Sequence, residues 1–351
     1  MSHLPSLLLT LCMLNQAPAL AAQAIKNQPP ITPRMGLLQT FKVGGEGGWD
    51  YVSIDSDGGR IYLSHGTKVQ VLDLDGKLKG EIPDTQGVHG IAIARELDRG
   101  FTSNGRTNSV TVFKLSTLEV VKVVKIQGEN PDAILYDAAT RQVFTFNGRS
   151  KDATVLSAES FEILGTMAMG GKPEFAVSDG KGKVFVNVED TSELLAIDAK
   201  ARKVFSRWPL KPVEDPSGLA IDVKNNRLFS VGGNQLMAVV DATSGKVVAT
   251  VATGQGTDAA AFDPGTGCAY ASNGRDANLT VIHEDAADKY TLVGNVPTKP
   301  GARTMALDPK THRIYLPTAE FGPMPKAEPG QRVRPPVIPG SFQVLVVGEA
   351  H

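Results

Sequence analysis

Apolar residues come in short runs along most of this chain, and the clearest set of runs lies between residues 130 and 172. Four runs stand there, at Ala133–Tyr136, Gln142–Asn147, Ala153–Ser157 and Glu162–Met169. Gly, Asn, Asp and Ser residues separate them. Short runs rich in β-branched and aromatic residues, with turn-forming residues between them, predict four antiparallel strands.

This four-run pattern repeats with a period of about 40 residues, the length of one four-stranded propeller blade. The other copies open at Asp50, Val88, Pro173, Pro216, Thr257 and Arg303. A lone four-stranded sheet cannot bury both of its faces, so such units pack against one another. The sequence therefore predicts an all-β fold, a seven-bladed β-propeller with four antiparallel strands per blade.

The last copy lacks its own fourth strand. Its second and third strands are expected at Arg313–Pro317 and Phe342–Val347, and the chain stops soon after. A further apolar run, Leu37–Val43, precedes the first copy. We expect this N-terminal strand to complete the last blade, because that pairing closes the ring and removes two exposed sheet edges.

A proline-rich insertion, Phe321–Ser341, separates the second and third strands of the last copy. It contains six prolines and interrupts an otherwise regular repeat. A long connection of this kind is either an ordered lid over a binding face or a disordered surface loop. The sequence leaves both interpretations open.

The N-terminal segment predicts export. In residues 1–21 an apolar run leads to the small-residue cleavage signature Ala19-Leu20-Ala21, which is typical of a secretory signal peptide. The run is too short to span a bilayer, so no transmembrane segment is expected in the mature chain. We expect residues 22–35 to form a flexible leader and residues 36–351 to form a single propeller domain. We therefore expect a periplasmic or secreted bacterial protein.

Several motifs carry a resemblance to a known family. They are Val52–Asp55 with Arg60–Ser64, Asp263–Gly267 with Tyr270–Asn273, and Val239–Lys246. These stretches look like YVTN-type β-propeller repeats, and the mature chain as a whole resembles the YncE-like exported bacterial propellers. The resemblance implies the fold and export, but it brings no catalytic residues with it, because the motifs build blades.

Propeller geometry indicates which residues could form a site. The loop before the first strand of a blade and the loop after its second strand lie on the same face, and here these loops are polar and varied. The loops on the other face are ordinary tight turns such as Asp55–Gly58 and Asp308–Thr311. The predicted ligand-binding residues on the polar face are Asp50, His65, His89, Asn104, Arg106, Asp132, Asn147, Arg149, Glu174, Asp258, Asn273, Arg275 and Arg303.

Two groups on this face have alternative interpretations. The tripeptide Asn-Gly-Arg occurs three times, at residues 104–106, 147–149 and 273–275. Its arginines would offer bidentate donors to a carboxylate or phosphate, or the Asn-Gly pairs are positive-φ turns that happen to precede arginine. His65 and His89, with acidic neighbours, would form a divalent metal site, or they line a water-filled channel mouth.

These observations favour a binding protein. The leading hypothesis is an exported propeller, monomeric, that binds a small anionic ligand, a peptide or a partner protein on its polar face. The alternative is a metal-assisted, lactonase-like hydrolase or lyase that uses His and acidic residues at the channel mouth. The chain carries no nucleophile elbow, phosphate-binding loop, haem motif or dinucleotide fingerprint. A weaker alternative is the binding of single-stranded nucleic acid. The net charge of −1 and the 6% aromatic content disfavour this function.

Overall fold

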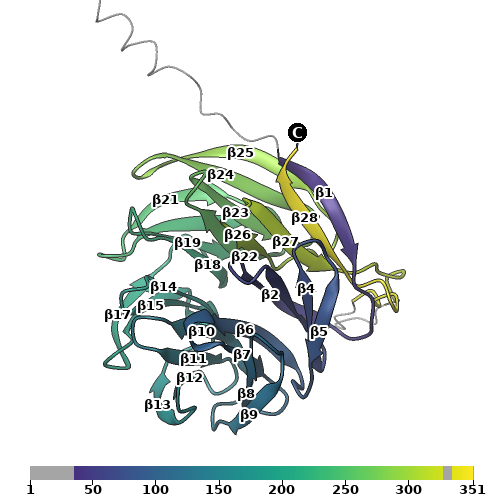
Figure 1. Cartoon of the computed structure of the whole chain (residues 1–351). Helices are drawn as coiled ribbons and strands as arrows, with labels where there is room; N and C mark the ends of the chain where they lie inside the picture. Colours follow the sequence, from purple (N-terminus) through teal and green to yellow (C-terminus); the bar gives the residue numbers. More distant parts are fainter. Residues whose placement is uncertain (1–34, 327–333, 351) are drawn as a thin grey trace, which may run out of the picture. The chain divides into compact units, whose positions relative to one another are not determined.

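A computed structural model describes residues 35–326 and 334–350 (Figure 1). The predicted signal peptide, the leader up to residue 34 and residues 327–333 of the proline-rich insertion lie outside the described residues. No helix in the described ranges has the length and apolar character needed to span a bilayer.

The described residues form seven antiparallel sheets of four strands each, as the repeat predicts. Blade 1 holds β2 (Trp49–Asp55), β3 (Arg60–His65), β4 (Lys68–Asp73) and β5 (Leu78–Ile82). Blade 2 holds β6 (Val88–Ala94), β7 (Arg99–Asn104), β8 (Ser109–Lys114) and β9 (Val120–Lys125), with the short η2 (Arg95–Leu97) between β6 and β7. Blade 3 holds β10 (Pro131–Asp137), β11 (Gln142–Asn147), β12 (Asp152–Ser157) and β13 (Ile163–Ala168).

The remaining blades repeat this order. Blade 4 holds β14 (Pro173–Ser178), β15 (Lys183–Val188), β16 (Glu193–Asp198) and β17 (Lys203–Pro209), with η3 (Glu189–Thr191) after β15. Blade 5 holds β18 (Pro216–Asp222), β19 (Arg227–Gly232), β20 (Leu236–Asp241) and β21 (Val247–Ala252). Blade 6 holds β22 (Thr257–Asp263), β23 (Cys268–Asn273), β24 (Asn278–Ala286) and β25 (Lys289–Pro297). Blade 7 holds β26 (Ala306–Asp308), β27 (Arg313–Thr318), β28 (Gln343–Glu349) and β1 (Met35–Lys42).

The N-terminal strand closes the ring, as the sequence predicts. β1 pairs antiparallel with β28, with Thr40 opposite Leu345 and Phe41 opposite Val344. The strand begins at Met35, two residues before the predicted start, and has a bulge between Leu37 and Gln39. Blade 7 thus contains both ends of the described chain, which Figure 1 shows in purple and yellow side by side.

The first strand of each blade lies nearest the centre. Each of these strands contacts the first strand of the next blade, and β26 contacts β2 to complete the circle (Figure 1). Apolar side chains fill the spaces between blades; one cluster joins Tyr315 and Phe342 of the last blade to Ile61 and Leu63 of the first. The blades therefore hold one another by buried surface, and the first strands position whatever lies at the centre.

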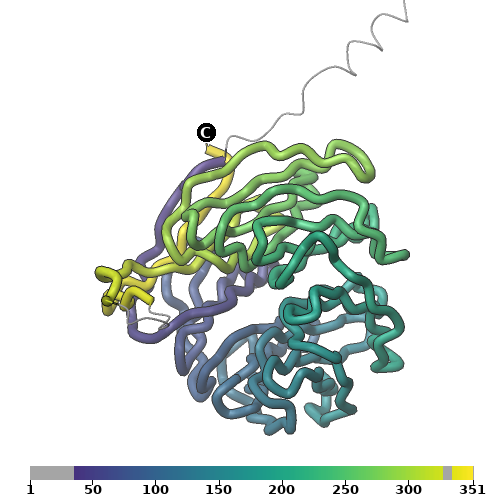
Figure 2. Tube along the Cα trace, turned by 180° about the vertical axis from the view of Figure 1, so that it is seen from behind, coloured from purple at the N-terminus to yellow at the C-terminus, as the bar shows by residue number. Residues whose placement is uncertain are grey.

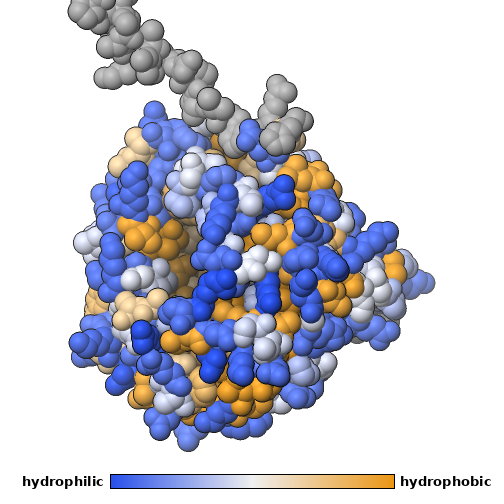
Figure 3. Space-filling model, in the orientation of Figure 1, coloured by the Kyte–Doolittle hydropathy of each residue, from blue (hydrophilic) through white to orange (hydrophobic). Residues whose placement is uncertain are grey.

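The fourth strands face outward and keep scattered apolar side chains at the surface. Figure 3 shows hydrophobic residues in separate patches among hydrophilic ones on the side it presents. Large exposed apolar residues on the fourth strands include Leu78, Val121, Val123, Ile163, Leu164, Phe205 and Leu292. Single apolar side chains of this kind are normal on a folded protein and point to no site.

Candidate functional site

Seven residues occupy equivalent positions at one end of the central strands, and we call them the mouth ring. In blades 1 to 6 each is the second residue of the first strand, and in blade 7 it precedes β26. The members are Asp50, His89, Asp132, Glu174, Ser217, Asp258 and Arg303. All but Ser217 were predicted site residues.

Ion pairs connect five members of the mouth ring into one chain. Arg303 pairs with Asp258 through Nη1 and with Asp50 through Nη2, the latter at 3.1 Å from Oδ1. On the other side of Asp50, Oδ2 lies 2.6 Å from Nδ1 of His89. The same nitrogen lies 3.6 Å from Oδ1 of Asp132. Charge therefore alternates around this part of the ring.

Two charged residues outside the predicted set form a second group of ion pairs around Glu174. Lys172 lies directly before β14, and its Nζ is 3.1 Å from Oε2 of Glu174. The same ammonium also pairs with Glu189 of η3. The sequence could have predicted Lys172 as a site residue, because it lies directly before Pro173 in a loop of the predicted polar face.

An aromatic pair lies inside the mouth ring. Tyr51 and Phe175 come from blades 1 and 4, nearly opposite each other, and their ring centroids are 5.4 Å apart. The residues at this position in the other blades are small: Gly90, Ala133, Gly218, Ala259 and Thr304. The two aromatic side chains can meet because the other five leave the space empty.

Close packing keeps some of these residues small. A Cβ on Gly218 would lie 2.4 Å from Cα of Ala259, in the backbone of the next central strand. Real Cβ atoms do not approach a backbone so closely, so glycine lets blades 5 and 6 meet. A comparison of side-chain size across the seven copies could have predicted the Tyr51–Phe175 pair from sequence.

The carboxylates of the mouth ring divide into two kinds. Burial raises the pKa of Glu174 to about 8, and the Asp132 carboxylate adds to the rise against the charge of Lys172. Burial also raises the pKa of Asp132 to about 6, with His89 opposing it and Asp50 adding to it. For Asp50, the effect of burial is outweighed by the hydrogen bond with His89 and the charge of Arg303, which lower its pKa. The Asp132–Glu174 side of the ring therefore holds a proton at neutral pH.

Two carboxylate oxygens on that side lack a hydrogen-bond donor. Oδ1 of Asp132 and Oε2 of Glu174 are buried and accept no hydrogen bond from any described residue. The nearest cations are Lys172, whose Nζ is 3.1 Å from Oε2 of Glu174, and His89, whose Nδ1 is 3.6 Å from Oδ1 of Asp132. Buried acceptors normally have partners, so these two atoms mark the side of the ring where hydrogen bonding is incomplete.

The three asparagines of the Asn-Gly-Arg repeats lie inside their blades. Each is fully buried, and its amide Nδ2 donates to a threonine on the third strand of its own blade at 2.7–3.0 Å. The pairs are Asn104 with Thr111, Asn147 with Thr154, and Asn273 with Thr280. These amides tie the second strand to the third, and the structure does not present them to a ligand on the face.

The Asn-Gly pairs are not positive-φ turns, so that interpretation is wrong. Positive φ occurs later in each turn, at Asn108, Lys151 and Ala277. Glycine is required there for space: a Cβ on Gly105 would lie 2.7 Å from Nε2 of His89, and one on Gly274 would lie 2.7 Å from Cβ of Arg303. These two glycines let the turns pack against the mouth ring.

The arginines of the three repeats are exposed. The side chains of Arg106 and Arg275 pack over Gly87 and Gly256, the residues just before β6 and β22. Arg106, Arg149 and Arg275 form no ion pair within residues 35–326 and 334–350. Their guanidinium groups are therefore open to anionic groups of a ligand.

The structure does not bring His65 and His89 together. His65 is 1% exposed, its Nδ1 lies 2.6 Å from Oε1 of Gln70, and its ring lies on Phe342 with centroids 4.2 Å apart. Burial lowers its pKa. Among the described residues, the group that could ligate a metal is Asp50, His89 and Asp132, whose ligand atoms lie within 4.8 Å of one another.

The described limbs of the proline-rich insertion lie at the outer side of the ring. Figures 1 and 2 show them projecting from the rim, away from the central strands. Phe321 forms a bridge with Val337, and its ring packs 6.1 Å from that of Trp49. These described limbs contact blade 1 at Trp49, the residue directly before Asp50, and the lid hypothesis stays a prediction.

Comparison with known proteins supports the fold class alone. The sequence matches no family model and no curated protein. The fold is similar to "Structure of U3-55K", with a TM-score of 0.72 and 8% identity over 91% of this chain and 99% of that chain. "Crystal structure of RRP9 WD40 repeats" gives a TM-score of 0.73 at 8% identity, over 91% and 99% of the two chains.

A chain of "Crystal Structure of Mitotic Checkpoint Complex" is a further structural neighbour. Its TM-score is 0.71 at 12% identity, over 88% of this chain and 95% of that one. The protein is thus a seven-bladed β-propeller, structurally like WD40 propellers. These identities show the fold alone and are too low to transfer a ligand or partner.

Proposed function

We propose that the protein binds a small molecule or peptide at the mouth ring. The ligand places an ammonium or hydroxyl group against Asp132 and Glu174, above the Tyr51–Phe175 pair. The observation that carries this proposal is the pair of buried oxygens, Asp132 Oδ1 and Glu174 Oε2, which have no hydrogen-bond donor among the described residues. Leaving buried acceptors unpaired costs about 1–3 kcal/mol each, and a ligand donor would recover it.

The charges around the mouth support a ligand with a cationic end. The ring, with Lys172 and Glu189, holds five acidic residues against three basic ones: Asp50, Asp132, Glu174, Glu189 and Asp258 against His89, Lys172 and Arg303. The proton on the Asp132–Glu174 side is one that a ligand cation would displace. Aromatic faces also attract cations. Farther out, the three exposed arginines suit anionic groups of the same ligand. An anion alone, the simplest form of the sequence-based hypothesis, fits the arginines but not the mouth.

The binding test compares matched ligands and matched variants. A thermal-shift screen of amino acids, amino sugars and short peptides, each beside its N-acetylated form, should yield ligands whose acetylated forms do not bind. Glu174→Gln and Asp132→Asn should weaken such a ligand at least about tenfold, or 1.4 kcal/mol. Glu162→Gln, an exposed change in blade 3, should have no effect. Equal binding by the parent and both mouth variants would place the site elsewhere.

A metal-dependent activity is a second candidate. One specific observation favours it: Asp50, His89 and Asp132 can converge on one ion. Imidazole and carboxylate together suit zinc or manganese. If the site holds such an ion, elemental analysis of the purified protein should give about one metal per chain, lost in His89→Ala and kept in His65→Ala. Metal-free parent protein that still binds the amine ligand would exclude this function.

We infer that the ligand is met outside the cytoplasm. The resemblance to YncE-like exported propellers and the predicted signal peptide, residues 1–21, support export. Protein recovered from a periplasmic extract should therefore have a new N-terminus close after Ala21, measured by intact mass. Recovery of the full-length chain only in the cytoplasm would oppose export.

A further inference from the structure

A contact between neighbouring blades recurs on the face opposite the mouth ring. In five blades the first strand ends in a buried aspartate, and these residues are Asp55, Asp137, Asp222, Asp263 and Asp308. Three of them accept a hydrogen bond from the following blade, at 2.6–3.1 Å. The donors are Arg95 for Asp55, Ser178 for Asp137 and His312 for Asp263.

Asp222, between blades 5 and 6, lacks such a donor. Its residue is 3% exposed, and its Oδ2 accepts no hydrogen bond within the described part of the chain. At this interface, blade 6 contributes the apolar Phe262 and Pro264 and the carboxyl group of Glu284. Burial raises the pKa of Glu284, and the neighbouring Asp222 carboxylate adds to the rise. Blade 6 therefore faces Asp222 with a carboxyl group and offers it no cation.

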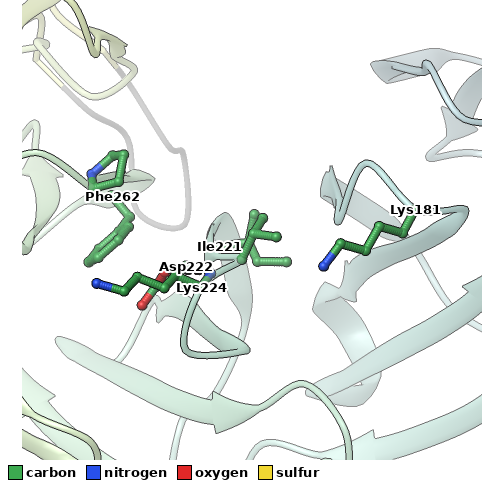
Figure 4. Close-up of a pocket in the computed structure, with 7 residues that line it drawn as sticks. Lys181, Ile221, Asp222, Lys224 and Phe262 are labelled. Carbon is green, nitrogen blue, oxygen red and sulfur yellow. Dashed lines mark hydrogen bonds between the residues drawn. The ribbon is translucent and has the colours of Figure 1, made fainter.

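A cavity of about 470 Å³ lies at the same place. Asp222 lines it, together with apolar walls from Ile221 and Phe262. Figure 4 shows Lys181 reaching toward Ile221 from one side, and Lys224 beside Asp222 and Phe262 on the other. Pockets that hold small organic molecules measure about 300–1,000 Å³ and combine apolar walls with a few polar groups.

The cavity combines three kinds of recognition. Lys181 and Lys224 are exposed and form no ion pair with any described residue, so they can hold an anionic group. Asp222 needs a hydrogen-bond donor. Phe262 and Ile221 suit an aromatic or aliphatic body. A matching ligand therefore has an anionic group, a hydrogen-bond donor close to it and an apolar body. A carboxylic acid with an apolar side chain and a hydroxyl or amino group has all three.

We propose that this cavity binds a hydrophobic α-hydroxy or α-amino acid. The carboxylate lies between Lys181 and Lys224, and the hydroxyl or ammonium group donates to Oδ2 of Asp222. The apolar body packs on Phe262. The site is separate from the mouth ring, since Asp222 ends the strand β18 whose second residue, Ser217, belongs to that ring.

Three probes separate the contribution of the donor to Asp222 from that of the carboxylate and the apolar body. They are L-phenyllactate, L-phenylalanine and 3-phenylpropanoate, titrated by calorimetry and by ligand-observed NMR at pH 7. The first two should bind saturably, and the third, which lacks the donor, about tenfold more weakly. Asp222→Asn keeps the shape but loses the charge, and should remove the advantage of phenylalanine over phenylpropanoate. The double change Lys181→Met with Lys224→Met should weaken all three about tenfold or more.

Two controls locate the site. Lys246→Met, an exposed change at the outer side of blade 5, should leave all three affinities unchanged. Glu162→Gln, the exposed change in blade 3, should also leave them unchanged. Lys181, Asp222 and Lys224 lie outside the mouth ring, so failure of this proposal is distinguishable from failure of the proposed function. The proposal is overturned if none of the three probes binds saturably, or if the double lysine variant binds them as tightly as the parent.

Discussion

A chain that begins at Val43 is expected to aggregate, whereas one that begins at Met35 should stay monomeric. The shorter chain lacks β1, and β28 would then present an unpaired edge to other molecules. It also loses Phe41, which is 5% exposed and belongs to the core cluster between blades 7 and 1. Size-exclusion chromatography with light scattering and thermal melting would measure both effects.

Single substitutions separate the effect of exposing the β28 edge from the effect of losing the Phe41 core contact. Phe41→Ala keeps the strand and should lower the free energy of unfolding by about 3–5 kcal/mol, a large part of a typical total of about 5–15 kcal/mol. Gln39→Ala, an exposed change on the same strand, should stay within about 0.5 kcal/mol. A monomeric shorter chain with the melting temperature of the longer one would contradict the closure role of β1.

Replacing Arg303 with methionine should lower the free energy of unfolding by about 2 kcal/mol at pH 7. Each hydrogen bond to a charged group contributes about 1.5–3 kcal/mol, and Arg303 makes two such pairs. Because the Arg303 side chain is 40% exposed, solvent screens both pairs, and the expected total is smaller than their sum. The variant leaves Asp50 and Asp258 without their cation. Urea unfolding of both proteins would measure the difference.

The pH dependence of that difference follows from the pKa of Asp50. Because His89 and Arg303 lower it in the folded protein, the stabilisation is fully present above the unfolded pKa of about 4 and is lost as pH falls through the lower folded value. The gap between parent and Arg303→Met should therefore be wide at pH 7 and should narrow as pH falls below about 4. Arg141→Met breaks an exposed pair with Glu159 and should cost less than about 1 kcal/mol. Equal stabilities of the two variants at pH 7 would show that the mouth pairs contribute nothing.

Repetition explains why the fold was predictable from the sequence. Each copy repeats the same order of apolar runs and turns, and the missing fourth strand of the last copy points to Leu37–Val43. Equivalent positions in a propeller lie at equal distance from the axis, so Asp50, Asp132 and Glu174 could be assigned to one opening before the structure was known. Their exact partners could not be assigned in the same way.

The errors come from side-chain direction. His65 and His89 follow equivalent loops, but the ring of His65 turns into the blade, against Phe342 and Gln70. The asparagine of each Asn-Gly-Arg repeat also turns inward, while its arginine faces solvent. Periodicity places a backbone position on a face, yet it does not decide between two neighbouring packing arrangements of the side chain.

The missing partner of Asp222 shows a different limit of prediction from the sequence. The aspartate itself is a regular feature of the repeat, and its turn looks ordinary in sequence. Its significance depends on what the next blade supplies, which is Phe262, Pro264 and the carboxyl group of Glu284 where other blades supply an arginine, serine or histidine. Only the pairing of blades 5 and 6 in space makes that absence visible and links it to the cavity.

Proton release on binding is the most direct test of the proposed function. An ammonium group at the mouth should lower the raised pKa of Glu174, about 8 in the free protein, so binding at pH 7 should expel a proton. Calorimetric titration of an amine ligand from the screen, in two buffers of different ionisation enthalpy, counts the protons released. The account predicts release approaching one proton for the parent and little for Glu174→Gln. No release by the parent, or the same release by both proteins, would contradict it.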